Sequence, residues 1–302
     1  MIFQILSIVS TYLMLKEGDY IHQYKVESMI GRGGFSEVYK VLHIKYNMYF
    51  AAKIIKNSED KLQQEKKLEE FYILKSLDHP NIVRIYDFFE EKQFIVLILE
   101  YCVQGSLQDK IDRDGPLGIE KTIFIGKQLI NALEYLHHRS IAHHDIKPQN
   151  VLLCQNDVVK LADYGTSLLC IYSHMSRDHR FTKKFAPPEA QSNSLMNVFL
   201  GDIYSLGYTL LCTLFGFRIV LLEDSNYVKN PQNKLEEIIH VMLSKEAEDR
   251  KTASMHKKLF DSLPSIDHKQ KNHLRGTRTQ TIVPLLIRRK ISWKLVKIKK
   301  HL

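Results

Sequence analysis

The stretch that decides the fold reads Ile141-Ala142-His143-His144-Asp145-Ile146-Lys147-Pro148-Gln149-Asn150-Val151-Leu152-Leu153, and Lys160-Leu161-Ala162-Asp163-Tyr164-Gly165 follows closely. Apolar runs at 151–153 and 158–161 predict a small hairpin. The chemistry-bearing side chains lie in the loops that bound it: Asp145, Lys147, Asn150 and Asp163. A carboxylate can orient a hydroxyl and take its proton, a lysine can neutralise phosphate oxygens, and amide and carboxylate oxygens are ligands for Mg²⁺. This ordered set predicts phosphoryl transfer.

A glycine-rich segment lies upstream and reads Gly31-Arg32-Gly33-Gly34-Phe35-Ser36-Glu37-Val38. The alternation on both sides predicts two strands joined at the glycines, over residues 24–42. A dinucleotide-binding turn needs a helix after its glycines, so this placement excludes that interpretation. Glycines let backbone N–H groups approach phosphate oxygens where a Cβ would block them. Taken alone, the segment is equally typical of an ordinary turn.

Lys53 lies in a third predicted strand, over residues 48–55. A lysine in a buried strand needs an anionic partner, because an unpaired buried ammonium is costly; without a partner, a surface position is the simpler interpretation. The following helix offers two carboxylates. Glu70 shares a helical stripe with Leu74, whereas Glu69 lines up with Ile73. Periodicity leaves both open.

The order of predicted elements indicates a β-rich part followed by a helical part. Two more strands are predicted at 82–89 and 94–101, and the first part has one helix, which runs from an N-cap at Ser58 to about Leu77. The second part has helices predicted at 119–138, 202–215, 235–243 and 252–260. The division near 102–105 predicts two lobes with a cleft between them.

Composition restricts the setting of the protein. The net charge of +9 belongs to the C-terminal end, because residues 265–302 contain eleven Lys or Arg and one acid, while the rest has 32 basic and 33 acidic residues. The cysteines are far apart and lack a C-x-x-C pair: Cys102, Cys154, Cys170 and Cys212. This spacing suits neither a zinc site nor a disulfide framework and predicts a reducing, cytoplasmic location.

The N-terminal residues 2–15 carry no charge and are strongly apolar. The stretch is short for a transmembrane helix, and it lacks the positive n-region and small-residue cleavage site of a secretory signal. We interpret residues 1–19 as a packing or accessory segment, or as the product of a mispredicted start. A signal anchor is the less favoured interpretation.

From about Tyr20 to Leu263 the sequence resembles the eukaryotic protein kinase family, whose signatures occur in order and at normal spacing. The resemblance implies an α+β, two-lobed fold. A small antiparallel β-sheet lobe with one main helix would span 20–101, a larger, mainly helical lobe 102–263, and a basic tail 264–302. It also implies ATP and Mg²⁺ as cofactors and proteins as substrates.

The matched motifs assign roles to individual residues. Asp145 would be the catalytic base and Lys147 would steady the γ-phosphate. Asn150 and Asp163 would bind the metal. Counting back from His79-Pro80 selects Glu70 over Glu69 as the partner of Lys53. By the resemblance, Leu99 is the gatekeeper and residues 100–102 are the hinge. The nucleotide would contact the Gly-rich loop, the strand lysine and the hinge: Ile30, Gly31, Arg32, Gly33, Gly34, Phe35, Ser36, Glu37, Val38, Ala51, Lys53, Glu100, Cys102 and Leu152.

The resemblance also implies a peptide platform and a substrate class. Glu189 of Pro187-Pro188-Glu189 would pair with Arg250, Asp202 would anchor the catalytic loop from a buried helix, and Thr182 would contact the catalytic aspartate and lysine. Lys147 is typical of serine/threonine kinases and argues against a tyrosine kinase. Among subgroups, NIMA-related and calmodulin-dependent-type kinases are nearest.

Several positions depart from the family pattern. Ser36 replaces the third glycine, Tyr164 replaces phenylalanine and Pro187 replaces alanine, each with little expected loss. His144 replaces the arginine that binds a phosphate on the activation loop, and histidine is only partly charged near neutral pH. We therefore expect little dependence on activation-loop phosphorylation.

Two questions stay open at the level of sequence. A pseudokinase scaffold is the alternative to an active enzyme, although Lys53, Glu70, Asp145, Asn150 and Asp163 are all present. The basic tail is either a solvated extension or an amphipathic segment that meets an acidic membrane or calmodulin. A nucleic-acid partner has only charge in its favour and is not expected.

Overall fold

The structure, a computed structural model, describes residues 15–34, 36–57, 61–91, 93–170, 173–176, 181–191, 195–216 and 230–264. The chain divides into two units, Met1–Pro264 and Ser265–Leu302, and all described residues lie in the first. Most of the apolar N-terminal segment, Phe35, the predicted N-cap Ser58 and the basic tail beyond Pro264 lie outside the described residues.

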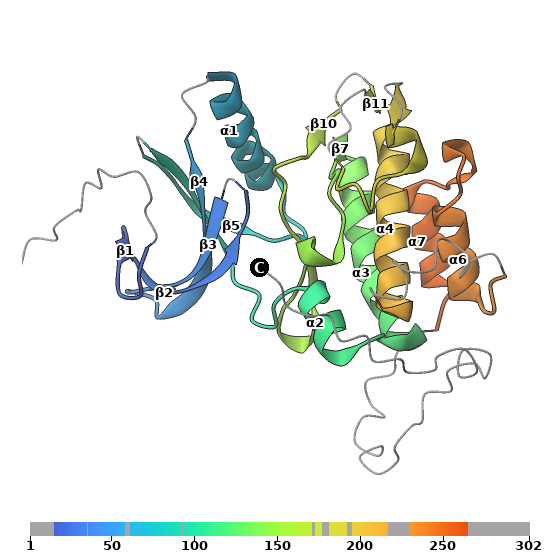
Figure 1. Cartoon of the computed structure of the whole chain (residues 1–302), viewed down its shortest axis with the longest axis horizontal. Helices are drawn as coiled ribbons and strands as arrows, with labels where there is room; N and C mark the ends of the chain where they lie inside the picture. The colour runs from blue at the N-terminus through green and yellow to red at the C-terminus, as the bar shows by residue number, and fades with distance from the viewer. Residues whose placement is uncertain are drawn as a thin grey trace, which may run out of the picture. The chain divides into compact units, whose positions relative to one another are not determined.

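The small lobe is an antiparallel sheet with one helix, as predicted (Figure 1). Its strand order is β1-β2-β3-β4-β6-β5. The bounds are β1 Tyr20–Ile21, β2 Tyr24–Arg32, β3 Ser36–His43, β4 Met48–Lys56, β5 Ile85–Glu90, β6 Phe94–Glu100 and α1 Lys61–Ser76.

Both faces of this sheet are packed. On one face, Tyr39 and Val41 of β3 join an outer cluster with Phe50. On the other face, Leu74 of α1 packs in the main core. The sheet can pack on both faces because a strand presents alternate side chains to opposite faces.

One predicted strand begins later than expected. Residues 82–89 were predicted as strand, whereas β5 starts at Ile85. Ile82 instead forms an isolated parallel bridge with Leu161, so the chain first contacts the large lobe before it enters the sheet. The connection therefore joins the two lobes at a second place besides the hinge.

The large lobe is mainly helical (Figure 1). Its helices are α2 Leu107–Asp114, α3 Gly118–His137, α4 Val198–Phe215, α6 Lys234–Met242 and α7 Ala253–Asp261, and its short strands are β7 Ile141–Ala142, β8 Val151–Leu153, β9 Val159–Leu161, β10 Leu168–Leu169, β11 Met175–Ser176 and β12 Met196–Asn197. Sequence reasoning missed α2, although Ser106 and Asp109 form a complete capping box at its start.

Helix α4 lies at the centre of this lobe. It begins four residues before the predicted start because the Asn197 side chain accepts hydrogen bonds from the N–H groups of Phe199 and Leu200. By length and composition α4 could cross a membrane, but 72% of it is buried within the protein. It is therefore the core helix that the sequence predicted.

Candidate active site

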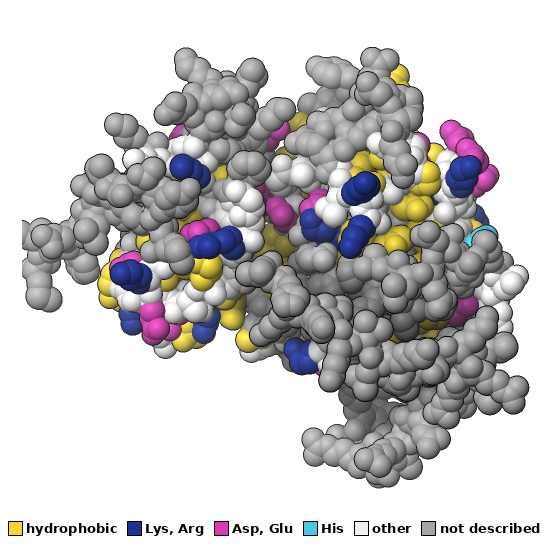
Figure 2. Space-filling view, in the orientation of Figure 1, with side chains coloured by type: hydrophobic (Ala, Val, Ile, Leu, Met, Phe, Trp, Pro, Cys, Tyr) yellow, Lys and Arg dark blue, Asp and Glu magenta, His cyan; other side chains and the backbone are white. Residues whose placement is uncertain are grey.

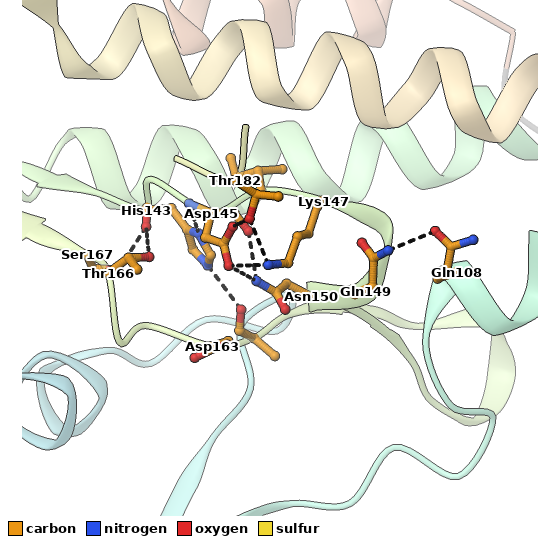
Figure 3. A network of polar contacts seen from close by, with 12 residues as sticks. Gln108, His143, Asp145, Lys147, Gln149, Asn150, Asp163, Thr166, Ser167 and Thr182 are labelled. Atoms are coloured by element: carbon orange, nitrogen blue, oxygen red, sulfur yellow. Dashed lines mark hydrogen bonds and ion pairs between the residues drawn. The ribbon is translucent and has the colours of Figure 1, made fainter. Parts of the chain in front are cut away.

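The loop between β7 and β8 collects polar side chains around one carboxylate. Lys147 Nζ lies 2.6 Å from Asp145 Oδ2 and 2.9 Å from Thr182 Oγ1. Asn150 Nδ2 donates to the backbone oxygen and to Oδ2 of Asp145, both at 2.8 Å. Thr182 donates to the other oxygen, Oδ1. Figure 3 shows Lys147, Asn150 and Thr182 pointing toward Asp145, so the contact predicted for Thr182 is present.

A buried aspartate in α4 holds this loop in place. Asp202 accepts hydrogen bonds from the backbone N–H groups of His143 and His144, both at 2.8 Å, and its Oδ2 lies 3.1 Å from His137 Nε2. Burial alone would raise the pKa of Asp202, but the hydrogen bond from His137 and the nearby histidines outweigh it and lower the pKa. His144 needs this support because its φ of 65° is unusual for a residue with a side chain.

The ring of His143 links the catalytic loop to the strand that precedes Asp163. Its Nδ1 accepts the Asp145 N–H at 3.2 Å, so Nε2, 3.1 Å from the Ala162 oxygen, carries the proton. Burial lowers the pKa of His143, which keeps this neutral form. The ring thus sets the distance between the backbones that carry Asp145 and Asp163. This role could not be predicted from the sequence, because the partners of the ring are backbone groups.

Lys53 of β4 meets two carboxylates from different parts of the chain. Its Nζ lies 2.7 Å from Glu70 Oε1 in α1 and 2.8 Å from Asp163 Oδ1. Glu70 is buried whereas Glu69 is exposed, and Glu70 is the helix carboxylate that contacts Lys53. Burial disfavours the charged lysine, but the two carboxylates outweigh it and raise the pKa of Lys53.

The two carboxylates around Lys53 differ in their electrostatics. Burial raises the pKa of Glu70. Burial also opposes the charged form of Asp163, but Lys53 outweighs it and the pKa of Asp163 is lowered. The Asp163 side chain keeps 46% of its surface exposed. An ionised, half-exposed carboxylate at this position is suited to hold a cation.

Asn150 and Asp163 fit the predicted metal ligands. Because the amide nitrogen of Asn150 is turned to Asp145, its oxygen points away from that carboxylate. Asp163 uses Oδ1 for Lys53, which leaves Oδ2 for a metal. Carboxylate and amide oxygens are the donors that Mg²⁺ prefers, and Mg²⁺ is usually held by few protein ligands together with substrate phosphates. These two residues would hold it.

The Gly-rich hairpin forms between β2 and β3 as predicted. Gly31 pairs with Val38, and Val38 in turn pairs with Lys53 across β3 and β4. The Gly33 N–H donates to the Ser36 oxygen at 2.7 Å and closes the turn, while Gly34 has open space around its Cα. Ile30, at the start of the hairpin, is 46% exposed. Phe35 lies outside the described residues.

Two residues of the predicted nucleotide set face each other instead. The Arg32 guanidinium lies 2.9 Å from Glu37 Oε1, on the strand pair that carries the glycines. This ion pair holds the two side chains against one another, and 52% of the Arg32 side chain stays exposed.

The hinge residues lie beside the strand that carries Ala51. Ala51 pairs with Leu99, the gatekeeper position, directly before Glu100. Glu100 is held by Lys160 at 2.8 Å, and Cys102 is buried. Leu152 forms an isolated bridge with Ser106, and the Gln104 N–H donates to the Leu153 oxygen at 3.0 Å. β8 therefore lies against the segment that follows the hinge.

The residues predicted to shape a peptide platform also meet. Arg250 Nη1 lies 2.6 Å from Glu189 Oε1, and Nη2 lies 2.8 Å from Oε2. The remaining Arg250 donors reach backbone oxygens of Ser244, Lys245 and Leu200. This bidentate pair fixes the segment that follows Thr182 to the large lobe.

Acidic and basic side chains lie next to each other between the two lobes in Figure 2.

Comparison with known proteins agrees with this geometry. Residues 24–280 match the protein kinase domain family. The chain is 37% identical over 192 residues to the serine/threonine-protein kinase RUNKEL of Arabidopsis thaliana, which covers 63% of this chain and 14% of that protein. It is 36% identical over 190 residues to 3-phosphoinositide-dependent protein kinase B of Dictyostelium discoideum, covering 60% and 21%.

A third relative is calcium-dependent protein kinase 5 of Plasmodium berghei, 30% identical over 213 residues, with 68% of this chain and 37% of that protein covered. The matches therefore span less than half the length of each of these three relatives. The family match covers most of this chain and includes every site residue described above. The chain belongs to the protein kinase family, and RUNKEL, one of the relatives it resembles, is a serine/threonine-protein kinase.

Proposed function

We propose that the protein transfers the γ-phosphoryl group of Mg-bound ATP to serine or threonine hydroxyls of proteins. One observation carries the proposal: Lys53, Asp163, Asn150 and Asp145 come together from three separate segments in two contact groups. Lys53 lies 2.7 Å from Glu70 and 2.8 Å from Asp163, and Asp145 lies 2.6 Å from Lys147 and 2.8 Å from Asn150. The chain thus combines a phosphate-binding cation, metal ligands and a carboxylate base in one place.

The residues divide the chemistry as follows. Asp145 orients the acceptor hydroxyl and takes its proton, while Lys147, held 2.6 Å from it, neutralises the transferred group. Lys53 holds the non-transferred phosphates, and Glu70 holds Lys53. Mg²⁺ bound at Asn150 and Asp163 would offset the charge of the phosphates. Catalysis then depends on positioning and charge, because phosphoryl transfer needs little covalent help from the protein.

The test compares wild type with Asp145→Asn on generic acceptor proteins and labelled ATP, with nucleotide affinity measured in parallel. We expect transfer by wild type and a loss of about 10²-fold or more in the variant, because a general base contributes that much. Nucleotide affinity should stay within about twofold. Equal background signal from both proteins would instead favour a pseudokinase scaffold.

We further propose that activity depends little on activation-loop phosphorylation. His144 is fully buried and its ring lies 4.5 Å from that of Phe181, centroid to centroid. Thr182 bonds to Asp145, and Ser167 donates to the His143 oxygen at 3.3 Å, so both hydroxyls already serve the catalytic loop. Phosphatase treatment of the active protein should leave most of its turnover; loss of most turnover would overturn this proposal.

The basic tail is proposed to contact an acidic surface. Residues 285–302 alternate basic with apolar positions, as in segments that bind anionic lipid or calmodulin. Binding of the 285–302 peptide to anionic vesicles, or to calmodulin with Ca²⁺, would support the proposal, and binding to neither would refute it.

The four cysteines form no disulfide, which supports the proposal of a reducing, cytoplasmic location.

A further inference from the structure

The outer face of the Gly-rich hairpin carries a set of contacts that the phosphoryl-transfer residues do not use. Val38 lies opposite Lys53 in the β3–β4 register, so both side chains are on the face toward the site. Because side chains alternate along a strand, Glu37 and Tyr39 lie on the opposite face. Arg32 lies directly opposite Glu37 and shares that face.

Both oxygens of the Glu37 carboxylate are occupied. Oε1 accepts from Arg32 Nη2 at 2.9 Å, and Oε2 accepts from the Tyr39 hydroxyl at 2.6 Å. The ion pair is partly exposed, with 52% of the Arg32 side chain and 26% of the Glu37 side chain accessible, and such a pair contributes little alone. Tyr39, the third residue of this set, is fully buried.

Tyr39 is a fixed point in the small lobe. Its ring belongs to the outer cluster with Val41, Phe50 and Ile98. Burial, together with the hydrogen bond to Glu37, raises the pKa of Tyr39 to about 12, so the hydroxyl stays protonated and remains a donor. The hairpin is therefore connected to a packed core through a neutral donor and a charged acceptor, a strong type of hydrogen bond.

The chain before β1 reaches the same cluster. Leu15 packs against the outer cluster, which contains Tyr39. The next residues are held along β2, because the Gly18 N–H donates to the Val26 oxygen at 2.9 Å and the Val26 N–H donates to the Asp19 oxygen at 2.8 Å. Leu15 is the last residue of the apolar N-terminal stretch, residues 2–15.

We propose that Glu37 and Tyr39 are positioning residues for the nucleotide: with Arg32 they fix the Gly-rich hairpin to the outer core, at the point where the N-terminal segment attaches. The proposal rests on the proposed function. A hairpin held in its binding conformation loses less freedom when the nucleotide binds. Releasing it should weaken ATP binding and leave the chemistry at Asp145 unchanged.

The experiment measures KM for ATP, kcat and the dissociation constant of a fluorescent ATP analogue on the full chain. Tyr39→Phe removes the hydroxyl and keeps the ring; Glu37→Gln keeps the shape and removes the charge. We expect each to raise KM for ATP and the dissociation constant by about 3- to 10-fold, the effect of one typical hydrogen bond, with kcat within about twofold. The double variant should show no more than the larger single effect.

Tyr24→Phe is the matched control. Tyr24 lies in the same outer cluster, and its hydroxyl donates to Asp87 Oδ2 at 3.4 Å, away from the hairpin. Its pKa is likewise raised to about 12 by burial and by Asp87. This variant should leave KM for ATP unchanged. Thermal midpoints of all variants check that each is folded.

Two results would overturn the inference: unchanged ATP parameters in Tyr39→Phe, or the same change in Tyr24→Phe, which would show a general effect on the core. Failure of the proposed function has a different signature, namely absence of transfer by wild type. In that case the analogue's dissociation constant still tests the hairpin contacts, and a wild type that binds no nucleotide would remove both proposals.

Discussion

Tyr164 shows how a single atom can be poorly accommodated in an otherwise well-packed site. Its ring is 1% exposed and packs in the main core, with its centroid 4.8 Å from that of the His143 ring. Its hydroxyl, however, has no hydrogen-bond partner among the described residues. A buried donor without a partner costs free energy.

Replacing Tyr164 by phenylalanine should therefore stabilise the protein. We expect Tyr164→Phe to raise the free energy of unfolding by about 1 kcal/mol, because the ring is retained and an unsatisfied hydroxyl is removed. Chemical denaturation of both proteins measures the difference. A variant less stable than wild type would show that the hydroxyl has a stabilising partner.

His256 gives the protein an acid sensitivity far from the catalytic residues. It is fully buried in α7, both ring nitrogens lack a partner within the described part of the chain, and burial lowers its pKa to about 4. In the unfolded chain the His256 ring binds a proton near pH 6.5, so above that pH its protonation costs the folded state no stability. The free energy of unfolding falls as the pH drops from 6.5 to about 4, because only the unfolded chain then binds the proton readily.

The loss should amount to about 1.4 kcal/mol per pH unit over this range. Unfolding free energies at pH 7, 6 and 5 for wild type and His256→Leu would measure it, and the variant should show the shallower dependence. Parallel curves for the two proteins would contradict the assignment.

Among the elements, helices α4 and α6 approach each other closely at a glycine. A Cβ added at Gly207 of α4 would lie 2.8 Å from Met242 Cβ of α6 and 3.3 Å from the Leu243 side chain. α4 and α6 could not keep their separation with a larger residue. Gly207→Ala should lower the free energy of unfolding by about 1–3 kcal/mol, as overpacking does. A thermal midpoint equal to that of wild type would show that α6 moves aside freely.

The elements that could be predicted from sequence are those with strong periodicity. β2, β3, β4 and β6 and helices α3, α4, α6 and α7 all appear near their predicted positions. α2 was missed because its eight residues contain few apolar positions, and only the Ser106–Asp109 capping box announces it. The late start of β5 could not be foreseen, since it depends on a bridge between Ile82 and Leu161, which are far apart in sequence.

For the site, the chemistry could be predicted but the supporting contacts could not. Helical periodicity left Glu69 and Glu70 open; the spacing to His79-Pro80 in the family pattern selected Glu70, and Glu70 is the one that is buried in the folded protein. His137 bonds to Asp202 across 65 residues, and His143 acts through backbone groups. Neither contact leaves a local pattern. The ion pair between Arg32 and Glu37 likewise leaves no local pattern, and the resemblance had placed both residues among the nucleotide contacts.

In the folded protein, the site exists only where the two lobes meet. The small lobe supplies Lys53 and Glu70, and the large lobe supplies Asp145, Asn150 and Asp163. Lys53 and Asp163, 110 residues apart, are joined at 2.8 Å. Any motion that separates the lobes would break this contact, so nucleotide binding and lobe position should be linked.

The most direct test of this arrangement is the affinity for ATP with and without Mg²⁺, measured by titration calorimetry on wild type and Asp163→Asn. If the convergent residues form one metal–triphosphate site, Mg²⁺ should strengthen ATP binding to wild type by about tenfold or more, a gain of about 1.4 kcal/mol, and this gain should disappear in Asp163→Asn. An ATP affinity that is indifferent to Mg²⁺ in wild type, or an equal gain in the variant, would contradict the account.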